Sequence, residues 1–136
     1  MPLGGVRIEL GRDPEWVLGT PDAPEVEHPN GATGIDHIVV LTPDLDAAVE
    51  RLRSQRLDYR RTREAGDGMR QAFFVLGPCL LELAGPVEGE ERLWGVTLVA
   101  RDLAPFGGTP KDAVQPGRRI TTVKDLGFPV AVMTPR

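Results

Sequence analysis

The feature that most constrains the fold of this chain is a repeat within it. The segment 34–45 (GIDHIVVLTPDL) returns in altered form at 92–103 (RLWGVTLVARDL), and each copy is an apolar run that ends in a turn and an Asp-Leu pair. A second pair of similar segments, 77–86 and 127–135, closes each half. Two halves that begin and end alike indicate one supersecondary unit used twice.

The repeat divides the chain into an N-terminal part, 1–33, and a repeated part, 34–136. We expect the repeated part to be a single domain, because 136 residues suffice for one core whereas two separate domains would each be marginal. Within it, unit one covers 34–86 and unit two covers 92–136. The N-terminal part begins with an alternating edge strand near Val6 and continues as an extended arm, whose prolines and glycines preclude a long helix.

In unit one the pattern predicts the order β-α-β-β-β. The expected elements are a strand at 34–42, a helix capped by Thr42 that runs to about Gln55, and strands at 57–64, 69–76 and 79–84. Pro43 and Asp44 suit the first turn of the helix. Apolar residues then recur at helical spacing and should face the core: Leu45, Ala48, Val49 and Leu52.

Unit two predicts a shorter version of the same order. A strand at 93–100 is followed by no helix, because the segment 104–110 contains two prolines and two adjacent glycines. The polar segment 111–118 has the composition of a turn, and strands should follow at 119–124 and 128–133. We therefore expect unit two to be β-loop-β-β, with its helix reduced or missing.

Composition excludes several classes of function. The net charge is −4, whereas binding to nucleic acid needs a basic face. The one arginine-rich stretch, 51–63, is interrupted by acidic residues and is typical of a solvated surface. Cys79 is the single cysteine, which rules out a disulfide within the chain and favours the cytoplasm. No apolar run approaches the ~20 residues that span a bilayer, and no signal peptide is recognisable, so we expect no membrane partner.

With this order of elements the chain resembles the vicinal oxygen chelate superfamily, which has the glyoxalase and bleomycin-resistance fold. The resemblance rests on DHIVV at 36–40, DLDAAV at 44–49, LEL at 81–83 and the repetition of the unit. The stretch 110–120 is similar to one found in glyoxalase-like proteins of unassigned activity. The resemblance implies an α+β fold in which two βαβββ-type units, the second lacking most of its helix, form a curved mixed sheet around a pocket.

The resemblance also implies a place for a metal, since metal-dependent members take ligands from the first and last strands of each unit. In unit one these positions carry His37 and Glu82, which suit a divalent zinc, iron, manganese or nickel ion. In unit two they carry Gly95 and Met133, which are not ordinary ligands of such ions. The missing ligands would have to come from Asp36, His28, a partner chain or the substrate, and a protein with no metal is an equally open reading.

Further residues are candidates for contact with a small molecule. Trp94 and Phe73 offer aromatic area. Arg118 and Arg119 are adjacent, so on a strand their side chains should point to opposite faces, and one of them could bind a carboxylate or enolate oxygen. Glu82 could act as a catalytic base beside its role as a ligand.

Three functions remain open from the sequence. The first is a glyoxalase-like enzyme, a metal-dependent lyase, isomerase or dioxygenase with a degenerate site. The second is a metal-free protein of the bleomycin-resistance type that binds a drug or metabolite. The third is a degenerate structural module that works by dimerisation. Because a shortened unit two leaves an open sheet edge, we expect a homodimer in each case.

Overall fold

The computed structural model describes residues 2–3, 6–7 and 28–136. At the N-terminus, β1 (Pro2–Leu3) and β2 (Val6–Arg7) pair antiparallel. The rest of the expected edge strand and most of the expected extended arm lie outside the described residues. The described part of the chain contains no helix that is long and apolar enough to cross a membrane.

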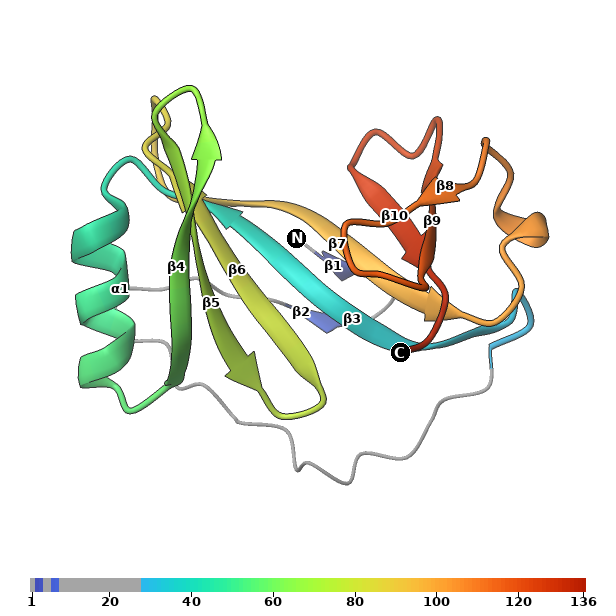
Figure 1. The fold of residues 1–136 in the computed structure, drawn as a ribbon, viewed down its shortest axis with the longest axis horizontal. Helices are drawn as coiled ribbons and strands as arrows, with labels where there is room; N and C mark the ends of the chain where they lie inside the picture. The colour runs from blue at the N-terminus through green and yellow to red at the C-terminus, as the bar shows by residue number, and fades with distance from the viewer. Residues whose placement is uncertain (1, 4–5, 8–27) are drawn as a thin grey trace.

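The repeated part folds into two units of matching topology (Figure 1). Unit one contains β3 (Ala32–Leu41), α1 (Leu45–Ser54), β4 (Asp58–Gly66), β5 (Met69–Leu76) and β6 (Cys79–Gly85). Unit two contains β7 (Arg92–Ala100), a single 3-10 turn η1 (Ala104–Phe106), β8 (Lys111–Asp112), β9 (Arg119–Val123) and β10 (Val130–Met133). The order and the near absence of a helix in unit two match the fold predicted from the repeat.

All eight strands of the two units form one mixed, curved sheet in the order β4-β5-β6-β3-β7-β10-β9-β8. In each unit the first and last strands are parallel neighbours, β3 with β6 and β7 with β10. The units join through the antiparallel pair β3–β7, and Figure 1 shows the remaining strands standing at the two ends of this long pair. The residues at the centre of the sheet therefore come from both units.

The start of the helix differs from the prediction. Asp44, not Thr42, is the N-cap: its backbone is extended, and its carboxylate accepts a hydrogen bond from the backbone N–H of Ala47 at 3.0 Å. Thr42 lies too early for this position: its N–H still donates to the carbonyl of Ala84 in β6, at 2.9 Å, and the helix begins only at Leu45. Thr42 thus still follows the path of the sheet, and the chain turns into the helix two residues later.

Unit two also contains one strand more than predicted. Lys111 and Asp112, which we expected in a turn, form β8 and pair antiparallel with Ile120 and Arg119 of β9. Two exposed charged residues at the edge of a sheet carry no apolar alternation, and this is why the sequence pattern did not indicate a strand.

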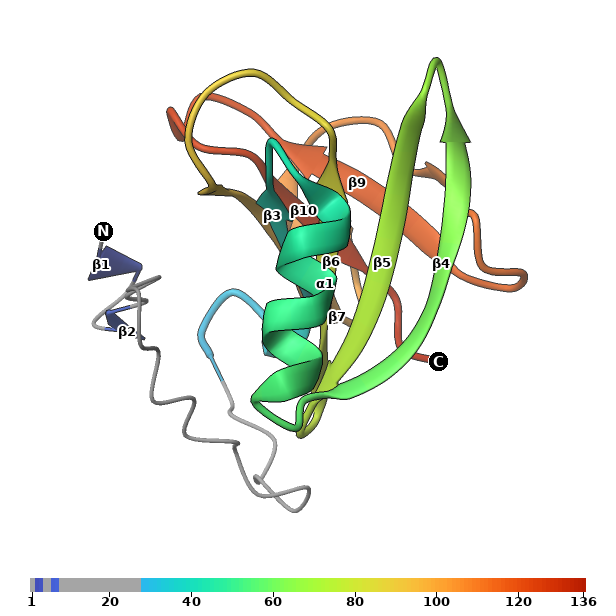
Figure 2. The ribbon, with the colours of Figure 1, turned by 90° about the vertical axis from the view of Figure 1, so that its left-hand side faces the viewer.

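The larger hydrophobic core lies between α1 and unit one's strands, which α1 covers (Figure 2). Its buried side chains are Val40, Leu45, Ala48, Leu52, Leu57, Ala72, Phe74, Leu81 and Leu83, with Val49 packed at its margin. Unit two, which lacks a helix, has a smaller cluster around Ala100, Leu103 and Val132. Since neighbouring residues of a strand point to opposite faces, Gln71, Phe73 and Glu82 project from the face of the sheet that α1 leaves uncovered.

We predict that the two adjacent phenylalanines of β5 differ sharply in their contribution to stability. Phe74 is fully buried and contacts the ring of Tyr59 edge-on, with 5.4 Å between the ring centroids, whereas Phe73 is half-buried on the opposite face. Phe74→Ala should lower the free energy of unfolding by about 3–5 kcal/mol, because it opens a cavity in the core. Phe73→Ala should lower it clearly less. Urea unfolding followed by circular dichroism measures both, and equal losses would contradict this view of the core.

Candidate functional site

The site is built around a β-bulge in β3. In the pairing of β3 with β7, Ile35 lies opposite Leu98 and His37 lies opposite Thr97, so that Asp36 has no partner of its own. A bulge of this kind re-aims the side chains of its strand. As a result, the neighbours Asp36 and His37 meet rather than pointing apart, and Asp36 Oδ2 lies 2.8 Å from His37 Nδ1.

Asp36 is held from the other side by Arg118, which lies next to β9 of unit two. Arg118 Nη2 donates to Asp36 Oδ1 at 2.7 Å, and Arg118 Nε donates to the carbonyl of Thr134 at 2.9 Å. Both side chains of the ion pair are about 95 % buried. Burial alone would raise the pKa of Asp36, but the hydrogen bonds from His37 and Arg118 and their charges outweigh it and hold the pKa at about 2. Asp36 is therefore an ionised acceptor.

This carboxylate fixes the orientation and the tautomer of His37. An ionised carboxylate only accepts hydrogen bonds, so Nδ1 of His37 must carry the proton that it donates to Asp36. When the ring is neutral, Nε2 then bears the lone pair, and it accepts from the hydroxyl of Thr97 at 3.0 Å. The hydrogen-bonded chain Arg118–Asp36–His37 thus leaves the lone pair of Nε2 for the hydroxyl of Thr97.

His37 and Thr97 line a cavity of about 300 Å³ on the face of the sheet opposite α1. This volume is at the lower end of the range typical of small-molecule sites. Strands of both units form its walls, and the lining residues are His37, Val39, Glu82, Trp94, Gly95, Val96, Thr97, Lys111, Ile120, Thr122, Pro129, Val130 and Ala131. Most of these side chains are apolar, so the few polar groups stand out.

Glu82 of β6 is the second titratable group in the cavity. It lies opposite Val39 of β3, and its Oε1 accepts a hydrogen bond from Gln71 Nε2 at 2.6 Å. Burial raises the pKa of Glu82, and the charges of His37 and Arg63 together with the hydrogen bond from Gln71 offset this effect only in part. A carboxylate with a raised pKa is a stronger proton acceptor than an exposed one.

The structure brings three of the residues singled out from the sequence into this cavity, namely His37, Glu82 and Trp94. Trp94 is 49 % exposed and forms part of the wall. Phe73 lies outside the lining, in contact with arginines of β4. Arg118 is hydrogen-bonded to Asp36 and is not among the residues that line the cavity.

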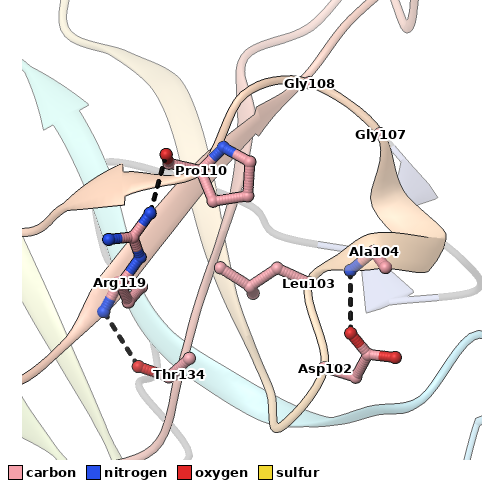
Figure 3. A pocket seen from close by; sticks show the side chains of 8 residues that line it. All are labelled: Asp102, Leu103, Ala104, Gly107, Gly108, Pro110, Arg119 and Thr134. Atoms are coloured by element: carbon pink, nitrogen blue, oxygen red, sulfur yellow. Dashed lines mark hydrogen bonds between the residues drawn. The ribbon is translucent and has the colours of Figure 1, made fainter.

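Arg119 lines a second cavity, of about 500 Å³, between η1 and the start of β9 (Figure 3). Its guanidinium donates to the carbonyl of Pro110 at 2.9 Å and to the carboxylate of Asp112 at 3.1 Å. Asp102, also in the lining, accepts from the backbone N–H of Ala104. The charged side chains that line this cavity are thus already hydrogen-bonded to other groups of the protein. Its lining contains no pair of titratable groups comparable to His37 and Glu82.

Sequence reasoning did not find Thr97 or Gln71. Thr97 becomes important only through the register that sets it opposite His37, and Gln71 only through the register that brings it beside Glu82. The one available signal was alternation along β5, which places Gln71 on the same face as Phe73.

The donor set does not fit a divalent metal centre. In the described residues no group of three or more His, Cys, Asp or Glu side chains could hold an ion together, whereas catalytic zinc usually has three protein ligands. His37 and Glu82 supply at most two. Asp36 is committed to His37 and Arg118, and His28 is exposed, with its Nδ1 accepting from the backbone of Asn30.

The counterpart of Glu82 in unit two is not the one expected. Glu82 lies opposite Val39, two residues beyond His37. In unit two, the residue two positions beyond Gly95 is Thr97, and Thr97 lies opposite Ala131. Ala131, rather than Met133, therefore occupies the matching place. Met133 is buried opposite Val99. Since alanine has no ligand atom, unit two still lacks the second ligand pair.

Comparison with known proteins supports the fold. No protein-family model matches the chain, and no curated protein sequence matches it. Among solved structures, methylmalonyl-CoA epimerase from Mycobacterium tuberculosis is similar with a TM-score of 0.63 and 18 % identity, over 82 % of this chain and 93 % of that one. The Streptomyces coelicolor epimerase in complex with 2-nitronate-propionyl-CoA gives 0.56 and 22 %, over 76 % and 97 %.

A glyoxalase I mutant from Zea mays is also similar, with a TM-score of 0.55 and 17 % identity over 76 % of this chain and 44 % of that one. Methylmalonyl-CoA epimerase and glyoxalase I share the fold of the vicinal oxygen chelate superfamily. The chain described here has this fold.

We predict that the buried ion pair stabilises the protein and does so in a pH-dependent way. The folded pKa of Asp36 is lowered from 3.8 to about 2, so the pair's contribution is complete above pH 4 and is lost as the pH falls towards 2. This shift corresponds to about 2 kcal/mol. Asp36→Asn should cost about 3–5 kcal/mol at pH 7, because it leaves the charge of Arg118 buried and unpaired.

Urea unfolding at pH 7 and at pH 3 measures this effect. The matched control is Asp112→Asn, which breaks the exposed pair with Arg119, the next residue along the chain. That control should change the free energy of unfolding by no more than about 1 kcal/mol. Equal losses in the two variants would contradict the role assigned to Asp36.

Proposed function

We propose that the cavity binds a small molecule with a carbonyl group and that the protein is an isomerase of the epimerase type. The observation that carries the proposal is that Glu82, with its raised pKa, and His37, with its fixed tautomer, line one mostly apolar cavity. Two proton acceptors that face one small space suit the removal and return of a proton on a carbon atom.

In the proposed reaction, ionised Glu82 takes the proton from the carbon next to the carbonyl. The electron pair of the broken C–H bond moves into the carbonyl group and forms an enolate, whose charge the ammonium group of Lys111 can balance. Return of a proton to the carbon restores the carbonyl and the carboxylate of Glu82. For a proton to leave and return by different groups, His37 has to carry a proton on Nε2, which it gives to the other face of the enolate; the proton held by Glu82 then passes through solvent to the neutral imidazole, and both groups are restored.

The similarity to two epimerase structures supports this class of reaction. The Streptomyces coelicolor enzyme was solved in complex with 2-nitronate-propionyl-CoA, and a further epimerase structure is in complex with methylmalonyl-CoA. We carry over the class of reaction and not the substrate. Because His37 and Glu82 alone do not complete a metal site, no step of the proposed reaction passes through a metal ion.

The apolar walls support a second candidate, a metal-free binding protein of the bleomycin-resistance type. The cavity offers apolar contact area from side chains that have no reactive group, namely Val39, Val96, Ile120 and Val130. Unit two contributes no pair of metal ligands. The experiment below separates this candidate from the isomerase. A homodimer and a cytoplasmic location remain predictions, and light scattering on the full chain would test the first.

We predict that the protein exchanges a carbon-bound proton with solvent. Methylmalonyl-CoA and a set of short 2-oxo acids are incubated with the full chain in D₂O, and ¹H NMR follows deuteration at the carbon beside the carbonyl. Glu82→Gln should lower the exchange rate by roughly 10²–10⁴-fold. Glu88→Gln, at an exposed glutamate, is the matched control and should leave the rate unchanged. The wild-type rate should rise with pH through a midpoint above 4.5, since Glu82 is active when ionised.

The same samples distinguish the alternatives. Quenching of Trp94 fluorescence by a compound that undergoes no exchange would support the binding protein. Exchange that requires added Zn²⁺, Mn²⁺, Fe²⁺ or Ni²⁺, and that a chelator removes, would support a metal-dependent enzyme. Exchange that Glu82→Gln leaves intact would overturn the proposed role of this residue.

A further inference from the structure

Two arginines of the edge strand β4 are not used by the proposed reaction. Arg61 lies opposite Phe73 and Arg63 lies opposite Gln71 in the pairing of β4 with β5. Phe73 in turn lies opposite Glu82 in the pairing of β5 with β6. The two arginines therefore stand on the face of the sheet that carries the cavity, and not on the face covered by α1.

Both guanidinium groups contact the same aromatic ring. Their Cζ atoms lie 5.5 Å (Arg61) and 5.4 Å (Arg63) from the ring centroid of Phe73, within the range of a cation–π interaction. The ring restricts two long side chains that would otherwise be mobile. A binding group that is held in place before the ligand arrives loses less conformational entropy when it binds.

Within residues 28–136, neither Arg61 nor Arg63 forms an ion pair. The same holds for Arg53 and Arg56, whereas other arginines do form pairs, among them Arg51–Glu91, Arg60–Asp58, Arg70–Asp46 and Arg119–Asp112. Like charges that converge on one ring repel each other unless an anion lies between or beside them. An anion beside the two guanidinium groups would therefore reduce their mutual repulsion.

A chain of hydrogen bonds connects this pair to the candidate site. Arg63 Nε donates to Gln71 Oε1 at 2.8 Å, and Gln71 Nε2 donates to Glu82 Oε1 at 2.6 Å. Arg63 keeps its two Nη groups for other partners, and in the described part of the chain no hydrogen bond occupies the guanidinium of Arg61. A molecule whose reacting carbon lies beside Glu82 would thus have these donors within reach along β5.

We propose that Arg61 and Arg63, spaced by Phe73, form an anion subsite that binds a carboxylate or phosphate group of the substrate. This inference rests on the proposed function, because it describes the substrate of that reaction. The substrate would be an anionic molecule whose uncharged end enters the cavity. Guanidinium groups suit both anions, since they donate paired hydrogen bonds. Asp58 and Glu64 in the same strand and the net charge of −4 oppose a long polyanion such as nucleic acid.

The test uses the ¹⁵N-labelled full chain and simple anions in place of the unknown substrate. Inorganic phosphate, malonate and its neutral analogue malonamide are titrated at constant ionic strength, and NMR follows the Nε–H signals of Arg61 and Arg63 and the backbone amide of Phe73. We expect saturable shifts with phosphate or malonate and none with malonamide. Which anion binds more tightly identifies the group that the substrate carries.

Two variants make the test specific. Arg61→Met combined with Arg63→Met should weaken anion binding at least about tenfold. Arg60→Met, which removes a neighbouring arginine that is paired with Asp58, is the matched control and should bind as the wild type does. Glu82→Gln should also retain anion binding while losing proton exchange, so a failure of this inference and a failure of the proposed function give different results.

Three outcomes would overturn the inference. The first is the absence of saturable shifts with either anion in the folded wild type. The second is anion binding that survives in the double variant, whose fold is checked by its NMR spectrum. The third is a single-stranded oligonucleotide that competes with phosphate and binds far more tightly than any small anion, which would indicate a nucleic-acid surface instead.

Discussion

The buried ion pair between Arg118 and Asp36 connects the architecture of this protein to its chemistry. Two buried charges are stable only when they are paired with each other, so the ion pair holds unit two in a fixed position against β3. The same carboxylate dictates which nitrogen of His37 carries a proton. One interaction between the two halves of the sheet thus determines both how the halves meet and what the group at their junction can do.

The two units have unequal roles despite their shared topology. Unit one has the helix and the larger core, and it supplies His37 and Glu82. Unit two has no α-helix and a small core, and it supplies most of the walls together with Arg118. The groups that need exact placement are therefore attached to the half with the most extensive packing, as expected for a site that depends on preorganisation.

The internal repeat was sufficient to predict the order of the elements along each unit. The curved sheet and the approach of His37 and Glu82 to one pocket were implied by the resemblance to the vicinal oxygen chelate superfamily. Neither could predict the bulge at Asp36, because one unpaired residue leaves no trace in a pattern of apolar residues. The ion pair of Arg118 with Asp36 depends on that bulge, so the sequence could not predict this pair either. The two-residue strand β8 carries no apolar alternation that could indicate it. The helix is capped by Asp44 because Thr42 is still hydrogen-bonded to Ala84 of β6, a contact that the local sequence does not reveal.

The separation of the large core from the cavity walls has an evolutionary consequence. Ile120, Val130 and Ala131 shape the cavity, yet none of them belongs to the cluster packed under α1. Substitutions at these positions can alter the shape and size of the accepted molecule while most of the folding energy is left intact. Related sequences can therefore differ in the compounds they recognise without needing compensating mutations in the core. Such a separation favours the evolution of new ligand specificities.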